Sequence, residues 1–137
     1  MPFVLDASTT ACWIFEDESH PYADAAFALV DQEDILVPSF LWWLETRNIL
    51  VLNERRRRLT ENQTIGFLRF LSGLTAIQDL MPDEAEILRV ARQYRLTVYD
   101  AAYLELALRK KAALATLDAE LIRAAKAEGV PIIGENL

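Results

Sequence analysis

Two aspartates in this chain each follow directly on an apolar run, in "FVLD" ending at Asp6 and in "LATLD" ending at Asp118. Such runs predict buried strands, and in parallel sheets ligands bind beyond the carboxyl ends of the strands. A carboxylate at that edge can bind a cation. Aspartate is also a favoured N-cap, however, and a helical pattern starts after each of these acids, so capping and chemistry both fit.

A third aspartate, Asp100, is expected to reach the same edge. It lies in "TVYDAAYLEL", where the pattern predicts the N-cap of a helix of about thirteen residues. That helix would run ~18–20 Å away from the edge, and the strand "ALATL" would return ~16 Å. Because the two legs nearly cancel, Asp100 and Asp118 should meet despite the 118 − 100 = 18 positions between them. Asp6 is expected at that edge too.

Glu45 is the fourth acid of interest because its surroundings do not suit a charge. On a helix its neighbours are Leu41, Trp42, Asn48 and Ile49, which form a mostly apolar face. A glutamate there must be paired, protonated or bound to a cation. Several carboxylates at one edge would repel one another without a cation. Their hard oxygen ligands suit Mg²⁺ or Mn²⁺ rather than zinc.

The elements that must position these acids alternate along the chain, which predicts an α/β fold with a mostly parallel sheet and helices on both faces. No interdomain linker is visible, so residues 1–137 are interpreted as one domain. Thr60 is expected to be an N-cap. The predicted strands are 2–6, 34–39, 76–81, 113–117 and 130–134, and the predicted helices are 8–15, 20–32, 40–58, 60–74, 82–95, 99–112 and 119–129.

Composition excludes several classes of protein. With 53% hydrophobic and 26% charged residues the chain is globular, and its net charge of −7 argues against a simple nucleic-acid-binding module. No apolar run approaches ~18 residues, and no basic segment precedes the first strand, so we expect neither a membrane span nor a signal peptide. The lone Cys12 is interpreted as a buried small apolar residue in a reducing cytoplasm, and the lone His20 as an ordinary loop residue.

The four consecutive arginines Arg55, Arg56, Arg57 and Arg58 leave two interpretations open. They can be a solvated helix end, where arginine is favoured by the helix dipole. They can instead be a patch that binds RNA phosphates or a protein partner. Four adjacent residues span a full helical turn, so not all of them can face one surface.

The segments "VLDAS", "PSFLWWLETRNIL", "LTVYDAAYLELAL" and "LATLDAELIRAAKAEGVPII" resemble, in this order, the PIN domain. This is a small metal-dependent nuclease fold, and the similarity is to its single-domain form in toxins of type II toxin–antitoxin modules. The resemblance implies a Rossmann-like α/β/α sandwich. Its acidic residues map onto Asp6, Glu45, Asp100 and Asp118, which would bind one or two Mg²⁺ (or Mn²⁺) ions and catalyse hydrolysis.

The resemblance also implies the supporting groups and partners. Ser8 and Thr116 match polar positions that would support the acids or the phosphate. Such toxins cleave RNA in the bacterial or archaeal cytoplasm, form homodimers, and are blocked by a cognate antitoxin. We expect the homodimer to use the helices in "FLWWLETRNIL" and "IGFLRFL", because the core cannot hold all of their large apolar residues, which include Trp42, Trp43, Phe67, Phe70 and Leu71.

Two other functions remain as alternatives. One is a catalytically silent PIN-fold module that acts only through antitoxin and operator binding, against which the complete acid set speaks. The other is a phosphoryl-transfer enzyme of the haloacid dehalogenase type, which also ends its first strand in Asp. That class needs a second Asp two residues later, where this chain has Ser8, and a lysine near the site, whereas the first lysine here is Lys110.

Overall fold

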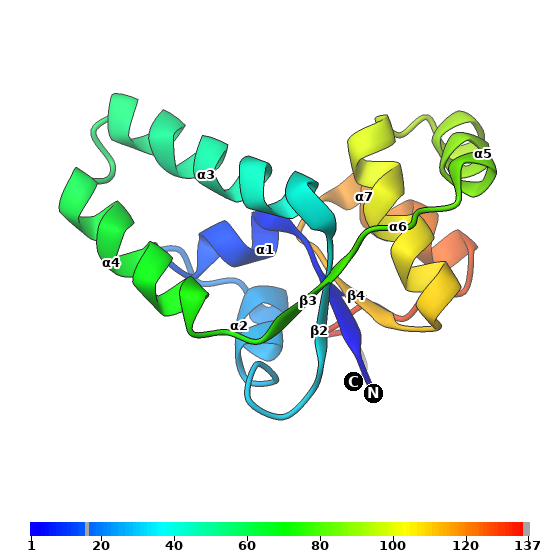
Figure 1. The fold of residues 1–137 in the computed structure, drawn as a ribbon, viewed down its shortest axis with the longest axis horizontal. Helices are drawn as coiled ribbons and strands as arrows, with labels where there is room; N and C mark the ends of the chain where they lie inside the picture. The colour runs from blue at the N-terminus through cyan, green and yellow to red at the C-terminus, as the bar shows by residue number, and fades with distance from the viewer. Residues whose placement is uncertain (16, 136–137) are drawn as a thin grey trace.

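Four short segments form one parallel sheet at the centre of the molecule (Figure 1). The computed structural model describes residues 1–15 and 17–135. The strands lie in the order β3-β2-β1-β4, and β1, one of the two central strands, is completely buried, as expected for a parallel sheet covered on both faces. Their bounds are β1 Phe3–Leu5, β2 Ile35–Pro38, β3 Ala76–Asp79 and β4 Ala113–Ala115.

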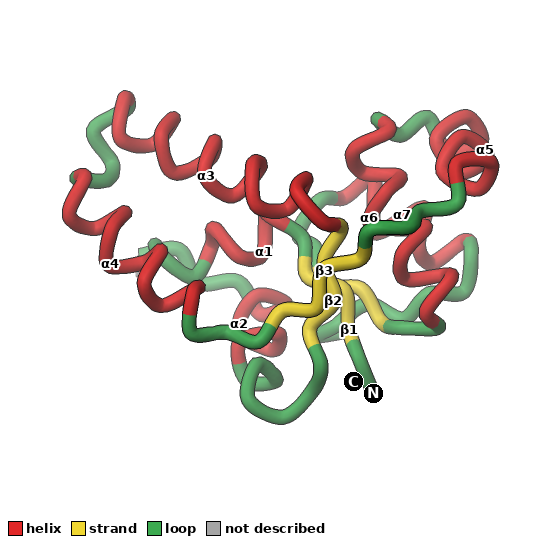
Figure 2. Tube along the Cα trace, in the orientation of Figure 1, coloured by secondary structure: helices red, strands yellow, loops and turns green. Residues whose placement is uncertain are grey.

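Helices make every crossover between these strands, which gives the α/β/α sandwich that the sequence predicts. Figure 2 shows the strands in the middle, with α1 to α4 on one side and α5 to α7 on the other. The bounds of the helices are α1 Ala7–Cys12, α2 Pro21–Phe27, α3 Ser39–Arg55, α4 Glu61–Ser72, α5 Glu84–Tyr94, α6 Val98–Lys110 and α7 Ala119–Ala127.

The register of the sheet sets where the strands end. Leu5 of β1 pairs with Ala115 of β4, and the Asp6 amide extends this ladder by donating to the Ala115 carbonyl at 3.1 Å. Strand β2 ends at Pro38, and α3 begins at the next residue. The chain therefore leaves β1, β2 and β4 at one edge of the sheet, where α1, α3 and α7 begin.

Side-chain caps fix the starts of these helices. Asp6 and Asp118 are the N-caps of α1 and α7, and each accepts a hydrogen bond from a backbone amide three residues later. Thr60 caps α4 as predicted and forms a reciprocal capping box with Gln63. The prediction that Asp100 is an N-cap is wrong. Thr97 caps α6, so Asp100 lies within the first turn of that helix and donates its amide to the Thr97 hydroxyl.

The hairpin of α3 and α4 extends beyond the sheet as an arm (Figure 1). A small apolar cluster of Phe15, Leu50 and Leu59 lies in this arm, apart from the main core around the sheet. The N-terminal part of α3 packs on β2 and α1 instead, and there the Trp42 indole donates to the Thr10 hydroxyl at 3.0 Å. One end of α3 is therefore fixed against the sheet.

Two predicted elements differ most from the observed ones. The predicted strand 130–134 is reduced to a single parallel bridge between Ile132 and Leu114, because only the backbone around Ile132 pairs with β4. The predicted helix 20–32 ends at Phe27 and continues in turns. Among the described residues, no helix is both long enough and apolar enough to cross a membrane.

Candidate active site

All four acids singled out in the sequence line one pocket of about 180 Å³. They come from four separate places in the chain: the end of β1, the second turn of α3, the first turn of α6 and the start of α7. The parallel sheet explains this convergence, since its strands end at the same edge. The residues that line the pocket are Asp6, Ala7, Ser8, Glu45, Asn48, Ile49, Asp100, Tyr103 and Asp118.

Asp6 is the most buried of these acids, with only 5% of its surface exposed. Burial raises the pKa of Asp6 to about 6, although hydrogen bonds from Thr116, Thr9 and Ser8 act in the opposite direction. The Ser8 hydroxyl lies 2.8 and 2.9 Å from the two carboxylate oxygens, and the Thr9 amide lies 2.9 Å from one of them. Asp6 therefore caps α1 and is also a buried carboxyl group that no ion pair among the described residues neutralises.

Glu45 is hydrogen-bonded rather than paired with a charge. The Tyr103 hydroxyl donates to Glu45 Oε1 at 2.7 Å, from a tyrosine that is almost fully buried. Burial raises the pKa of Glu45, the nearby Asp100 raises it further, and the Tyr103 hydrogen bond lowers it. The group that contacts Glu45 is thus a neutral hydroxyl, and the expectation that this acid is paired, protonated or bound to a cation stays a prediction.

Asp100 and Asp118 complete the acidic side of the pocket. Burial raises the pKa of Asp100, and the charge of Asp118 raises it further. Asp118 itself is exposed and accepts the Leu121 amide at 2.9 Å. The acids thus act on one another electrostatically, Glu45 with Asp100 and Asp100 with Asp118.

The donor chemistry of the pocket fits a hard divalent cation, because its charged ligands are all carboxylate oxygens. Within the described ranges, however, no three His, Cys, Asp or Glu side chains are close enough together to hold a metal ion jointly. Mg²⁺ does not require three, since it usually keeps several waters and is bound by one or two carboxylates together with substrate phosphates. A cation here would also relieve the repulsion that raises the pKa of Asp100.

The two predicted supporting hydroxyls lie behind the acids and connect β1 to β4. Ser8 contacts Asp6 and also accepts the Leu117 amide at 3.1 Å. Thr116 is buried, and its hydroxyl accepts the Asp118 amide at 3.1 Å. They hold the Asp6 and Asp118 segments side by side.

Tyr103 and Asn48 are pocket residues that the sequence analysis did not select as site residues. Each lies three positions after an acid on the same helix, Tyr103 after Asp100 and Asn48 after Glu45. The spacing of three residues on a helix therefore indicated that these side chains lie on the same face as the acids. What was lacking was a reason to expect a tyrosine hydroxyl at the pocket rather than in the core.

The four consecutive arginines, residues 55–58, do not form one patch in the structure. Arg55, Arg56 and Arg57 are exposed at the tip of the α3–α4 arm, where Arg57 adopts a left-handed conformation with φ 59°. Arg58 folds back, pairs with Glu18, donates to the Asn53 side chain at 3.2 Å and lies over the Phe15 ring. Arg58 thus supports the arm, so the four arginines do not form one uniform patch.

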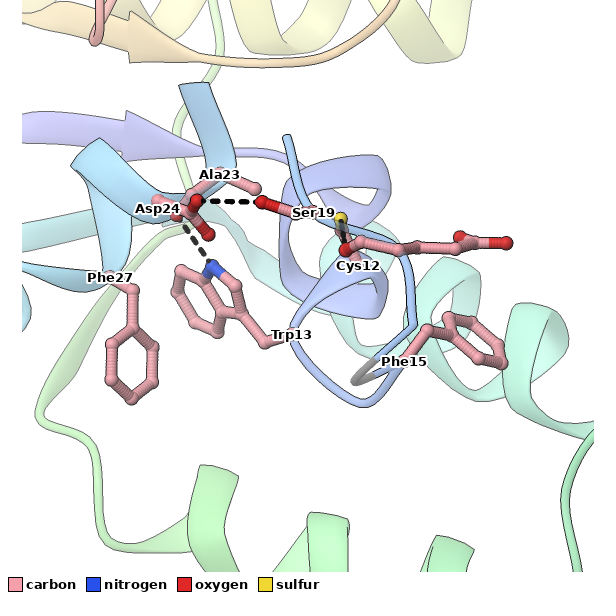
Figure 3. A pocket seen from close by; sticks show the side chains of 8 residues that line it. Cys12, Trp13, Phe15, Ser19, Ala23, Asp24 and Phe27 are labelled. Carbon is pink, nitrogen blue, oxygen red and sulfur yellow. Dashed lines mark hydrogen bonds between the residues drawn. The ribbon is translucent and has the colours of Figure 1, made fainter. Parts of the chain in front are cut away.

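A second, larger hollow of about 320 Å³ lies beside the end of α1 and the start of α2 (Figure 3). The Trp13 indole bonds the Ala23 carbonyl at 2.9 Å, and Cys12 Sγ lies 3.5 Å from the Glu18 carbonyl. Cys12 is half-buried at this hollow, so its interpretation as a buried residue is wrong. His20 is the N-cap of α2 and accepts the Tyr22 amide through Nδ1.

Fold and pocket together define an α/β protein with an acidic site at the carboxyl edge of a parallel sheet. The model of the PIN domain family matches residues 3–127, and the chain belongs to this family. PIN domains are generally nucleases and typically use divalent metals. The chain is also similar to PAE2754 from Pyrobaculum aerophilum, whose crystal structure matches with a TM-score of 0.64 and 26% identity over 90% of this chain and 87% of that one. No curated protein matches the chain significantly.

Proposed function

We propose that this PIN domain is a Mg²⁺-dependent endoribonuclease and the toxin of a type II toxin–antitoxin module. The observation that carries the proposal is the single pocket to which four distant segments contribute Asp6, Glu45, Asp100 and Asp118. Membership of a generally nucleolytic family supports the reaction class. The toxin role comes from the sequence resemblance.

The chain's own residues have defined tasks in this proposal. Mg²⁺ (or Mn²⁺) would be held by one or two of the four carboxylates together with water and the substrate phosphate, and when bound it would activate water and stabilise the charge that develops on the scissile phosphate. Tyr103 keeps Glu45 pointed into the pocket, and Ser8 does the same for Asp6. Thr116 fixes the turn that presents Asp118. No histidine lines the pocket, so proton transfer would fall to the carboxylates and water.

The experiment is RNA cleavage by purified protein, free of any antitoxin, with Mg²⁺ and with EDTA. One observation favours the alternative of a catalytically silent module: no three acids in the described part of the chain are arranged to share an ion. That alternative predicts no cleavage in either condition, together with retained binding to the antitoxin and to operator DNA in its complex.

We also propose a homodimer, whose contact uses only the exposed members of the apolar residues that the sequence suggested. Trp42 and Leu71, at 6% and 5% exposure, lie in the core and cannot form the interface that the sequence suggested. Phe70 is exposed on α4, and its ring stacks on those of Phe27 and Phe67. This apolar face of α2 and α4 is the proposed contact. Light scattering of Phe70→Asp should show monomers where the unaltered chain shows dimers.

A further inference from the structure

Three planar side chains form a continuous stack on the outer face of α3. Phe40, Trp43 and Arg47 follow one another at spacings of three and four residues, so they lie on one side of the helix. The Phe40 and Trp43 rings have centroids 5.2 Å apart and planes only 10° from parallel. Arg47 Cζ lies 4.0 Å from the centroid of the Trp43 ring. The result is a flat surface of two rings and one guanidinium.

The protein core does not use this stack. Phe40 is 60% exposed and Trp43 is 40% exposed, whereas the adjacent Trp42 is buried and bonded to Thr10. The two rings also form no aromatic pair with the α2–α4 cluster proposed as the dimer contact, as far as the described residues show. Exposed rings that contribute little to the core are expected where a ligand covers them.

The charge of Arg47 is also available to a ligand. Its hydrogen bond within the described part of the chain goes to the Trp43 carbonyl, at 3.2 Å, and none of the ion pairs found there includes it. In a chain with a net charge of −7, a guanidinium without a carboxylate partner favours an anionic ligand. Arg55, eight residues further along α3, lies about 80° around the helix from Arg47.

The chemistry of this surface matches one class of ligand. A nucleobase stacks on an aromatic ring whatever its sequence, and a guanidinium next to the ring binds the phosphate of the same strand. The base faces of a duplex are hidden within its own stack, so the matching ligand is single-stranded. Glu45 and Asn48 of the same helix line the acidic pocket, about a third of a turn around the helix.

We propose that Phe40, Trp43 and Arg47 are a binding site for unpaired bases of single-stranded RNA, beside the acidic pocket. This inference rests on the proposed nuclease function and assigns the surface that would hold its substrate strand. A strand whose bases lie on Phe40 and Trp43, with a phosphate at Arg47, would have its next nucleotides at the pocket. Restriction to unpaired RNA would then come from this stack, and hydrolysis from the acids.

Binding of three labelled probes in EDTA tests the site without relying on cleavage. The probes are a single-stranded oligouridylate, an abasic strand with the same number of phosphates, and a hairpin duplex. The unaltered chain should bind the oligouridylate best. Phe40→Ala/Trp43→Ala should weaken that binding about tenfold or more and leave the abasic strand unaffected. Arg47→Gln should weaken binding of both strands and make its salt dependence shallower. Met81→Ala, at a residue 79% exposed, is the matched surface control.

Two results would overturn the site. One is equal affinity of the double variant and the unaltered chain for the oligouridylate. The other is a double variant that becomes monomeric in light scattering without losing RNA affinity, since the stack would then contact a second copy. If the unaltered chain cleaves no RNA but the base-dependent binding is present and depends on the stack, the nuclease proposal fails and the binding site stands.

Discussion

Replacing Asp6 by asparagine should stabilise the metal-free protein, and only above a defined pH. Burial raises the pKa of Asp6 from its ordinary value of 3.8 to about 6 in the folded chain. As pH rises, the unfolded chain therefore loses this proton first, and the free energy of unfolding falls between about pH 4 and pH 6. At about 1.36 kcal/mol per pKa unit, the full loss at neutral pH is about 3 kcal/mol.

The amide side chain introduced by Asp6→Asn cannot ionise, but its oxygen can still accept the Thr9 amide and so keep the cap of α1. We therefore expect Asp6→Asn and the unaltered chain to have similar stability at pH 4. The variant should be about 1–3 kcal/mol more stable at pH 8, the lower end allowing for a weakened Ser8 hydrogen bond.

Urea denaturation in EDTA at both pH values measures this difference. The matched control is Asp31→Asn, a change at an exposed acid of the α2–β2 loop, which should follow the unaltered chain. A variant that is less stable at both pH values, or equally shifted at both, would refute the reasoning that burial of the Asp6 charge opposes folding.

Three further predictions concern the surroundings of the acids. Tyr103→Phe removes the donor to Glu45 at 2.7 Å, so Mg²⁺ affinity measured by calorimetry should fall about tenfold, with an unchanged circular dichroism spectrum as the control for folding. Mg²⁺ should raise the melting temperature of the unaltered chain but raise that of Asp100→Asn much less, because the variant lacks a repelling charge for the ion to neutralise. Joint replacement of Arg55, Arg56 and Arg57 by glutamine should weaken RNA binding and reduce its salt slope by about 0.7 per lost phosphate contact. Normal cleavage with failed antitoxin neutralisation would assign these arginines to the antitoxin instead.

The sequence predicted the fold class because strand and helix patterns alternate along the chain. It predicted that the acids lie near one another because the strands of a parallel sheet end at one edge. Asp6 and Asp118 each end an apolar run, and a parallel sheet brings such residues to one edge. Glu45 was recognisable as a charge on an apolar helix face. The family match confirms the resemblance to the PIN domain, whereas the toxin type and the roles of the acids remain predictions.

The wrong predictions concern residues that are near one another in the sequence and equally suited to one structural position. Thr97 and Asp100 are both good caps, and the structure uses the earlier one, so α6 starts at Val98. Trp42 and Trp43 are identical in the pattern, yet the helical phase buries one and exposes the other. A left-handed residue at Arg57 turns Arg58 back onto the arm. Local patterns cannot resolve such choices, because packing between distant segments decides them.

The most direct test of a shared acidic active site is Mg²⁺-dependent RNA cleavage by Asp6→Asn, Glu45→Gln, Asp100→Asn and Asp118→Asn, each purified in parallel with the unaltered chain and Asp31→Asn. Parallel purification controls for contaminating nucleases. We expect cleavage by the unaltered chain and by Asp31→Asn with Mg²⁺ but not with EDTA, and a loss of at least about 100-fold in each of the four pocket variants. Full cleavage in EDTA, or full activity in any two of the four pocket variants, would contradict this expectation.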